Sequence, residues 1–171
     1  MKALQYIELM LMASLSFASC KKNNPQPLPT SAINIINASA DVPTLSVNFV
    51  LQPIPFYQQM GLVSYGSSLE YGEASGTVPL TLVSSSDTTG HIYQSNLSLV
   101  AGGIYSMYVY GMLTSVSAMM LQDHIPVHQD SVSGARFINL SPDAGPVNIS
   151  IQGNSTNEFT SCGFLSLSSS R

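Results

Sequence analysis

The amino-acid sequence predicts an all-β fold, and three observations support this. Between residues 32 and 133, apolar and polar residues alternate in short runs separated by turn-forming residues, as expected for half-buried strands. Only 8% of the residues are charged, whereas strand-forming and turn-forming residues dominate. One segment also recurs after 102 residues, close to the roughly 100 residues of one sandwich domain. Together these features predict an immunoglobulin-like antiparallel β-sandwich with one full unit and the truncated start of a second.

Residues 32–133 form the predicted complete unit, and five of its segments show the strand pattern most clearly. Pro79 confines one of them to an edge strand or to the first residues of a strand, because proline lacks a backbone N–H group. The glycine pair at residues 102–103 predicts a hairpin turn between the segments His91–Val100 and Ile104–Leu113. The predicted strands are Leu45–Leu51, Thr77–Val83, His91–Val100, Ile104–Leu113 and Val116–Leu121.

The repeated segment is Ile36–Asp41, which returns as Ile138–Asp143 with Ile, Asn, Ser and Asp at the same positions. Asn, Asp and Ser side chains bond nearby backbone groups, and the neighbouring prolines prevent strand pairing. We therefore interpret both copies as turns between strands. A calcium site at the two Asp residues is the alternative, although no local run of acids supplies the six to eight oxygen ligands that calcium takes. Ser161–Gly163 aligns with Ser64–Gly66 if the second copy is shorter by a few residues.

Residues 134–171 form the predicted second unit, which has only 38 residues. A segment of this length does not bury a hydrophobic core alone. It therefore adds strands to the first unit, pairs with another chain, or remains loosely attached. We expect the chain to be truncated relative to its relatives.

Residues 1–19 have the features of an export signal. Lys2 supplies a short positive region, and the apolar stretch Leu9–Ala18 is too short to span a bilayer. Small residues precede Cys20, which resembles the lipobox of bacterial lipoproteins, so we predict cleavage before Cys20 and attachment of acyl chains such as palmitate to it. Residues 20–31 are polar and proline-rich and form a predicted tether. The lack of an Asp directly after the cysteine indicates the outer membrane, and an ordinary cleaved signal is the alternative.

Three tyrosines of one predicted strand, Tyr105, Tyr108 and Tyr110, are the candidate binding residues. Tyrosine on an exposed sheet face can stack on sugars or peptides, whereas half-buried tyrosines that pack the rim of the sandwich are the alternative. A glycan or protein ligand is therefore expected, and the membrane is a second expected partner because the N-terminal lipid would insert into it. The formal net charge of −4 and the few basic residues exclude a phosphate-backbone footprint, so no nucleic-acid partner is expected.

No residue is assigned to catalysis, to a metal or to a cofactor. His124 and His128 have the spacing of a helical zinc pair, but a proline lies between them, and a strand would hold them roughly 13 Å apart. Glu70 and Glu73 are close in sequence, like the carboxylates of a glycosidase, but are interpreted as solvated charges beside a glycine-rich turn. Cys162 has no basic neighbours that would activate its thiol, so we expect a small buried hydrophobe.

Three segments resemble domain-of-unknown-function family 4397: Ile36–Pro43, Ala101–Gly111 and Arg136–Ala144. The resemblance covers most of residues 33–171. It implies tandem β-sandwich modules on bacterial envelope lipoproteins and gives no catalytic residues to carry over. We therefore expect a lipid-anchored envelope protein, facing the periplasm or the cell exterior, with a binding or scaffolding role and no catalysis. The alternatives are an envelope hydrolase whose Ser, His and Asp come from distant segments, with His91 among the candidates, and a remnant without function.

Overall fold

The computed structural model describes residues 27–50, 61–124 and 134–168. These residues contain ten strands and no helix, so the described part holds no apolar helix of membrane-spanning length. The strand bounds are Thr30–Asn37 (β1), Thr44–Asn48 (β2), Leu62–Ser64 (β3), Ser68–Ala74 (β4), Gly76–Ser84 (β5), Asp87–Leu99 (β6), Ile104–Met112 (β7), Ser115–Gln122 (β8), Val147–Ser150 (β9) and Asn157–Cys162 (β10).

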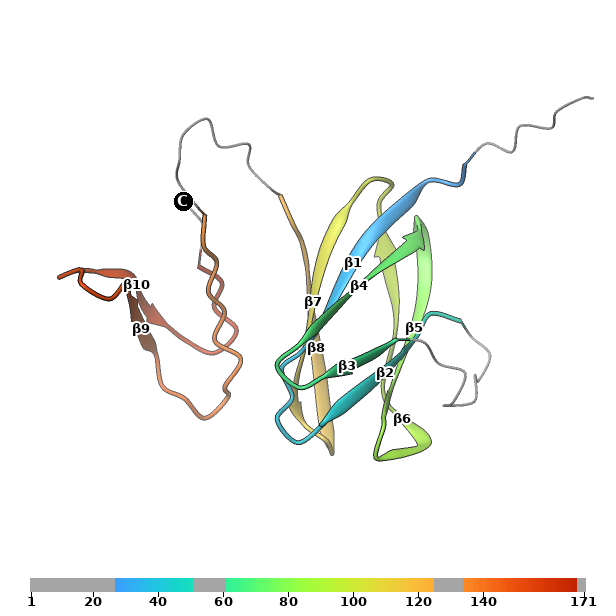
Figure 1. Cartoon of the computed structure of the whole chain (residues 1–171), viewed down its shortest axis with the longest axis horizontal. Coiled ribbons are helices and arrows are strands. Elements are labelled where there is room, and N and C mark those ends of the chain that lie inside the picture. Colours follow the sequence, from blue (N-terminus) through green and yellow to red (C-terminus); the bar gives the residue numbers. More distant parts are fainter. Residues whose placement is uncertain (1–26, 51–60, 125–133, 169–171) are drawn as a thin grey trace, which may run out of the picture.

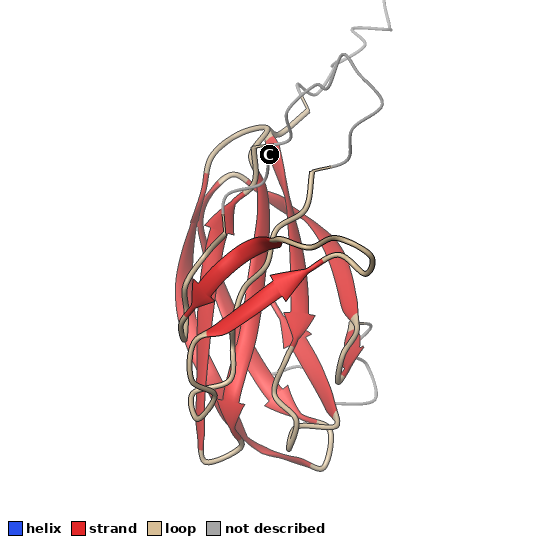
Figure 2. Ribbon diagram, turned by 90° about the vertical axis from the view of Figure 1, so that its left-hand side faces the viewer, coloured by secondary structure: helices blue, strands red, loops and turns tan. Residues whose placement is uncertain are grey.

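The first eight strands form two four-stranded sheets that lie face to face (Figures 1 and 2). Sheet A has the order β4-β1-β7-β8, and sheet B has the order β3-β2-β5-β6. The predicted β-sandwich is thereby confirmed. We call these eight strands the sandwich, and residues 134–168 the C-terminal segment.

The core lies between the two sheets, because alternate residues of each strand point inward. In β1 and β7 the inward residues include Ile35 and Val109, and in β5 they include Leu82; all three side chains are fully buried. The full core cluster is Ile33, Ile35, Val42, Leu45, Val47, Val63, Val78, Leu80, Leu82, Leu97, Leu99, Tyr105, Met107 and Val109. The strict alternation leaves the opposite face of β7 free to contact other parts of the molecule.

One strand pair departs from the predicted antiparallel arrangement. β1 and β7 pair in parallel, from Ala32 with Ile104 to Asn37 with Val109, so sheet A is mixed. Parallel neighbours need a long crossover connection. Here strands β2 to β6 supply it by passing through sheet B, back to β4 in sheet A, and through sheet B again.

Pro79 lies in β5, which is an inner strand of sheet B. β2 pairs only with Thr81–Ser84 of β5, whereas Pro79 pairs with Asn96 of β6. The proline therefore occupies the half of β5 that pairs with one described strand, as proline does at sheet edges, because it lacks an N–H group to donate.

The C-terminal segment is built from one antiparallel strand pair and one pair of isolated bridges, of which the first is antiparallel and the second parallel. β9 pairs with β10, and residues 137–139 approach residues 164–168 through bridges that join Ile138 to Leu167 and Asn139 to Phe164. The segment lies beside the sandwich on the side of β7 and β8 (Figure 1).

Candidate functional site

The first repeated turn, residues 37–42, is organised by the side chain of Asn37, and we call it the first corner. Asn37 is fully buried at the end of β1. Its Nδ2 donates to the carbonyl oxygens of Val42 at 2.9 Å and Val63 at 3.2 Å, and its Oδ1 accepts from the backbone N–H of Ser39 at 3.1 Å. One amide side chain thus joins the end of β1 to the backbone that leads into β2 and to β3.

The second repeated turn, residues 139–144, forms three of the same contacts, and we call it the second corner. Asn139 is 5% exposed. Its Oδ1 accepts from the backbone N–H of Ser141 at 3.1 Å, and its Nδ2 donates to the carbonyl oxygen of Cys162 at 3.1 Å. The Ser141 hydroxyl donates to Asp143 at 2.8 Å, and this bond lowers the pKa of Asp143 below its ordinary value. The predicted turn therefore occurs twice and shares three hydrogen bonds, whereas the bond from Asn37 to the Val42 carbonyl oxygen is found in the first corner.

The structure also corrects the alignment of the later part of the repeat. Gly66 donates its N–H to the Asn37 carbonyl, and Leu165 donates its N–H to the Asn139 carbonyl, each at 2.8 Å. Both residues are in the left-handed region, with φ of 74° and 57°. Gly163 therefore corresponds to Ser64, so the predicted match of Ser161–Gly163 with Ser64–Gly66 is wrong by two residues.

Asp41 joins the first corner to the turn between β7 and β8. Its Oδ1 accepts from the Ser39 hydroxyl at 3.2 Å, and its Oδ2 accepts from the backbone N–H of Leu113 at 2.8 Å. The Ser39 hydroxyl also lies 2.6 Å from the Gly111 carbonyl oxygen, to which it can donate. Asp41 thus uses both carboxylate oxygens within the fold. The described residues contain no cluster of three or more His, Cys, Asp or Glu side chains that could share a metal ion.

The three candidate tyrosines of β7 are divided between the two faces of sheet A. Tyr105 is only 4% exposed and belongs to the core, where its hydroxyl accepts from the backbone N–H of Val100 at 2.9 Å. Tyr108 and Tyr110 are half-buried on the outer face. The Tyr110 ring packs edge-on against Phe164 of the C-terminal segment, with centroids 5.8 Å apart. Part of the outer face is therefore occupied by the chain itself.

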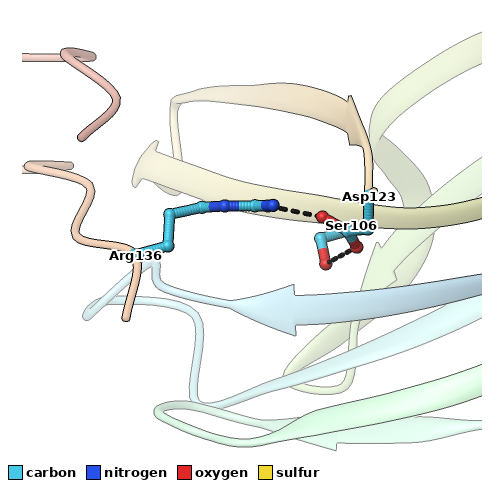
Figure 3. A network of polar contacts seen from close by, with 3 residues as sticks. All are labelled: Ser106, Asp123 and Arg136. Carbon is cyan, nitrogen blue, oxygen red and sulfur yellow. Dashed lines mark hydrogen bonds and ion pairs between the residues drawn. The ribbon is translucent and has the colours of Figure 1, made fainter. Parts of the chain in front are cut away.

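A polar contact holds the C-terminal segment to the same face (Figure 3). The Ser106 hydroxyl of β7 donates to Asp123 Oδ2 at 2.6 Å, and the Arg136 guanidinium forms an ion pair with Asp123 Oδ1. The hydrogen bond to Asp123 raises the pKa of Arg136, with a smaller contribution from Tyr108. The Arg136 side chain is 28% exposed. This contact was not predicted from the sequence. Arg136 was nevertheless a possible signal, because it is the only lysine or arginine among the residues that the structure describes.

A cavity of about 610 Å³ lies between the two corners. Asp41 of the first corner and Asp143 of the second contribute carboxylates to its wall, and the turns after β3 and β7 complete it. Its lining residues in the described part of the chain are Ala38, Ala40, Asp41, Tyr65, Gly111, Met112, Leu140, Ser141, Pro142 and Asp143. The cavity is mostly apolar, and these residues include no histidine.

The other residues singled out in the sequence lie apart from this cavity. His91 on β6 and His124 after β8 are both exposed, while His128 and Cys20 lie outside the described residues. Glu70 and Glu73 fall on opposite faces of the regularly paired strand β4, so they do not form a carboxylate pair. Burial raises the pKa of Glu73 above its ordinary value.

Cys162 is a free cysteine and is 7% exposed. It occupies the position of Val63 in the repeat, because the carbonyl oxygen of each residue accepts a hydrogen bond from the side-chain amide of a corner asparagine. The prediction of a small buried hydrophobe is therefore confirmed.

The fold and the site define a β-sandwich module whose strands are tied by an asparagine-centred corner that is repeated along the chain. A family model described as "Domain of unknown function (DUF4397)" matches residues 31–150, and the chain belongs to this family. Among solved structures, the chain is similar to the C-terminal domain of AlgF from P. aeruginosa. That match has 13% identity and a TM-score of 0.37, and it covers 57% of this chain and all of that one. A search of curated proteins found no match.

Proposed function

We propose that this protein is a lipid-anchored module of the bacterial cell envelope that acts by binding or scaffolding, without catalysis. The observation that carries the proposal is the contact at the outer face of β7. There an aromatic pair, Tyr110 with Phe164, and an ion pair, Asp123 with Arg136, hold a second strand-containing segment against the sandwich.

This contact combines the two features of a recognition surface. Tyrosine offers a rigid, amphipathic contact area, and arginine is a common residue of interfaces because its planar guanidinium matches a carboxylate. The polar side chains of the two corners, by contrast, bond the backbone of their own turns. Their hydrogen bonds serve the fold of the turns, and this supports a binding or scaffolding role.

The location and the anchor follow from the N-terminal sequence. The export signal, the small residues before Cys20 and the polar, proline-rich residues 20–31 favour acylation at Cys20 and a tether that separates the sandwich from the membrane. β1 begins at Thr30, so the sandwich starts as the proposed tether ends. Attachment to the outer membrane is the proposed location.

Metabolic labelling with a clickable fatty acid tests the anchor. The parent chain, Cys20→Ala and Cys162→Ala are expressed with the full N-terminus in a Gram-negative host, and the incorporated label and membrane fraction are measured. We expect the parent and Cys162→Ala to be labelled, because only Cys20 accepts lipid, and Cys20→Ala to be unlabelled and released from the membrane. Equal label in Cys20→Ala and the parent, or no label in either, would contradict the proposal.

A further inference from the structure

The cavity between the two corners has the size and composition of a site for a small organic molecule. Its wall combines the first corner, the turn after β3, the end of β7 and the second corner. Its volume of about 610 Å³ falls within the roughly 300–1,000 Å³ of small-molecule sites. Such sites are mostly apolar and contain a few polar groups that orient the ligand. Here the carboxylates of Asp41 and Asp143 stand among apolar side chains.

Two large apolar side chains of this wall are accessible. Tyr65 is 54% exposed and Met112 is 67% exposed. Alanine, leucine and proline residues of the two corners line the same cavity. Exposed apolar side chains that gather at one place mark interaction sites, whereas scattered ones need no explanation. The wall therefore offers a contact area for the apolar body of a ligand.

Hydrogen bonds hold both carboxylates of the wall in place. Asp41 accepts from the Ser39 hydroxyl and from the Leu113 N–H group, and Asp143 accepts from the Ser141 hydroxyl. A carboxylate has about four lone-pair sites, so these bonds leave both groups able to accept from a ligand as well. Groups that are already ordered lose little further entropy on binding, so the two acceptors are preorganised.

The negative charge of the wall has no basic partner among the described residues. Arg136, the only lysine or arginine there, forms its ion pair with Asp123, and none of the described lining residues is a histidine. Calcium takes about six to eight oxygen ligands, which a mostly apolar wall does not supply. Charge complementarity combined with the apolar surface therefore favours an organic cation.

We propose that the cavity between the two corners binds a small organic cation in which a protonated amine is attached to an apolar body. The amine pairs with the carboxylates of Asp41 and Asp143. The apolar body contacts Met112 and Tyr65, and the tyrosine ring also attracts a cation. This inference goes beyond the proposed function, because it assigns a ligand to a place separate from the contact between the C-terminal segment and the outer face of β7.

Three ligands with the same phenylbutyl body test the role of charge. At neutral pH 4-phenylbutylamine is a cation, 4-phenylbutanol is neutral and 4-phenylbutanoate is an anion. Each is titrated into the isotope-labelled full chain, and the amide signals of Gly111 and Ser141 are followed by nuclear magnetic resonance. We expect saturable shifts with the amine at a Kd on the order of 1 mM, as for a ligand of this size. The alcohol should bind about threefold more weakly, because a partly exposed ion pair contributes modestly, and the anion should not saturate.

Matched variants of the full chain locate the binding. Asp143→Asn is expected to weaken amine binding about threefold and to leave alcohol binding unchanged. Asp87→Asn is the control, because Asp87 also accepts from a hydroxyl two residues later, that of Thr89, but lies outside the cavity wall; it should bind the amine like the parent. Tyr65→Ala should weaken the amine and the alcohol alike. Circular dichroism melts should show the sandwich transition of the parent in both Asp variants, because both residues are exposed.

The proposal fails if the amine causes no saturable shift of the Gly111 and Ser141 signals, if amine and alcohol bind equally, or if Asp143→Asn binds the amine like the parent. Calcium chloride is titrated in parallel. Saturable calcium binding at the same amides that displaces the amine would assign the cavity to a metal ion and would also overturn the proposal. None of these results bears on the anchor, because fatty-acid labelling at Cys20 is measured independently.

Discussion

The buried amide of Asn37 gives the sharpest test of the corner. Asn37→Ala removes three hydrogen bonds and leaves two carbonyl oxygens and one N–H group without their side-chain partner in a buried turn. At about 1 kcal/mol of net stability for each bond, the free energy of unfolding falls by about 3 kcal/mol, and by more if the freed groups stay dry. A change of this size lowers the Tm of a domain of about 100 residues by more than 10 °C.

Urea denaturation followed by far-UV circular dichroism measures this loss, and two matched variants isolate its cause. Asn139→Ala removes the equivalent amide from the second corner, outside the sandwich, and Asn96→Ala removes an exposed amide from β6. Both are expected to shift the sandwich transition by less than about 0.5 kcal/mol. The reasoning is refuted if Asn37→Ala unfolds within 0.5 kcal/mol of the parent, or if Asn139→Ala costs the sandwich as much as Asn37→Ala.

Two further predictions concern Tyr71 and the outer face of sheet A. Burial raises the pKa of Tyr71 to about 12. The difference between the ultraviolet titrations of the parent and Tyr71→Phe should show one tyrosinate forming near that pH. The stabilising contribution of Tyr71 should be retained below pH 10 and lost as the pH rises towards 12, because the tyrosine of the unfolded chain ionises first. A titration midpoint near pH 10 would contradict this prediction. The combined variant Arg136→Ala and Phe164→Ala removes contacts worth about 1–2 kcal/mol, so its radius of gyration from small-angle X-ray scattering should increase while the sandwich melt is unchanged. Identical scattering of variant and parent would show that other contacts hold the segment.

The corner and the strands could be predicted because their causes are local. Asn, Ser and Asp bond backbone groups two to five residues away, as Asn37 does with Ser39 and Val42, so the turn can be read from a short segment. The strands follow from alternation, which the burial pattern of β5 reproduces from Val78 onward. Both signals lie in neighbouring residues and need no knowledge of distant contacts.

The parallel pair of β1 and β7 could not be predicted, because it joins residues about 70 positions apart and no turn signal specifies it. The misaligned repeat has a different cause. The sequence match placed Gly163 opposite Gly66, but Leu165 takes the left-handed conformation of Gly66 in the second copy. Left-handed backbone is costly for a residue with a Cβ atom, so the identity of a leucine does not indicate this conformation.

The candidate binding face shows the same division between local and distant information. The prediction of a binding face was wrong for Tyr105, which lies in the core, because alternation along the strand separates it from Tyr108 and Tyr110 on the outer face. The occupant of that face was not predictable, since Phe164 comes from a segment more than 50 residues later. Arg136 gave a usable signal, because an isolated cation in a chain with few charges favours a specific carboxylate partner, but the sequence did not single out Asp123.

The two copies of the corner share the bonds within the turn but differ in their long-range contacts. Asp41 reaches the backbone of Leu113, and Ser39 bonds Gly111, so the first corner is joined to the β7–β8 turn that closes the sandwich. The second corner keeps the bonds of Asn139 and Ser141, although the described part of the chain places no counterpart of that turn beside it. The bonds among Asn139, Ser141 and Asp143 therefore recur without a contact to such a turn, which explains why the corner can be recognised from a short segment of sequence.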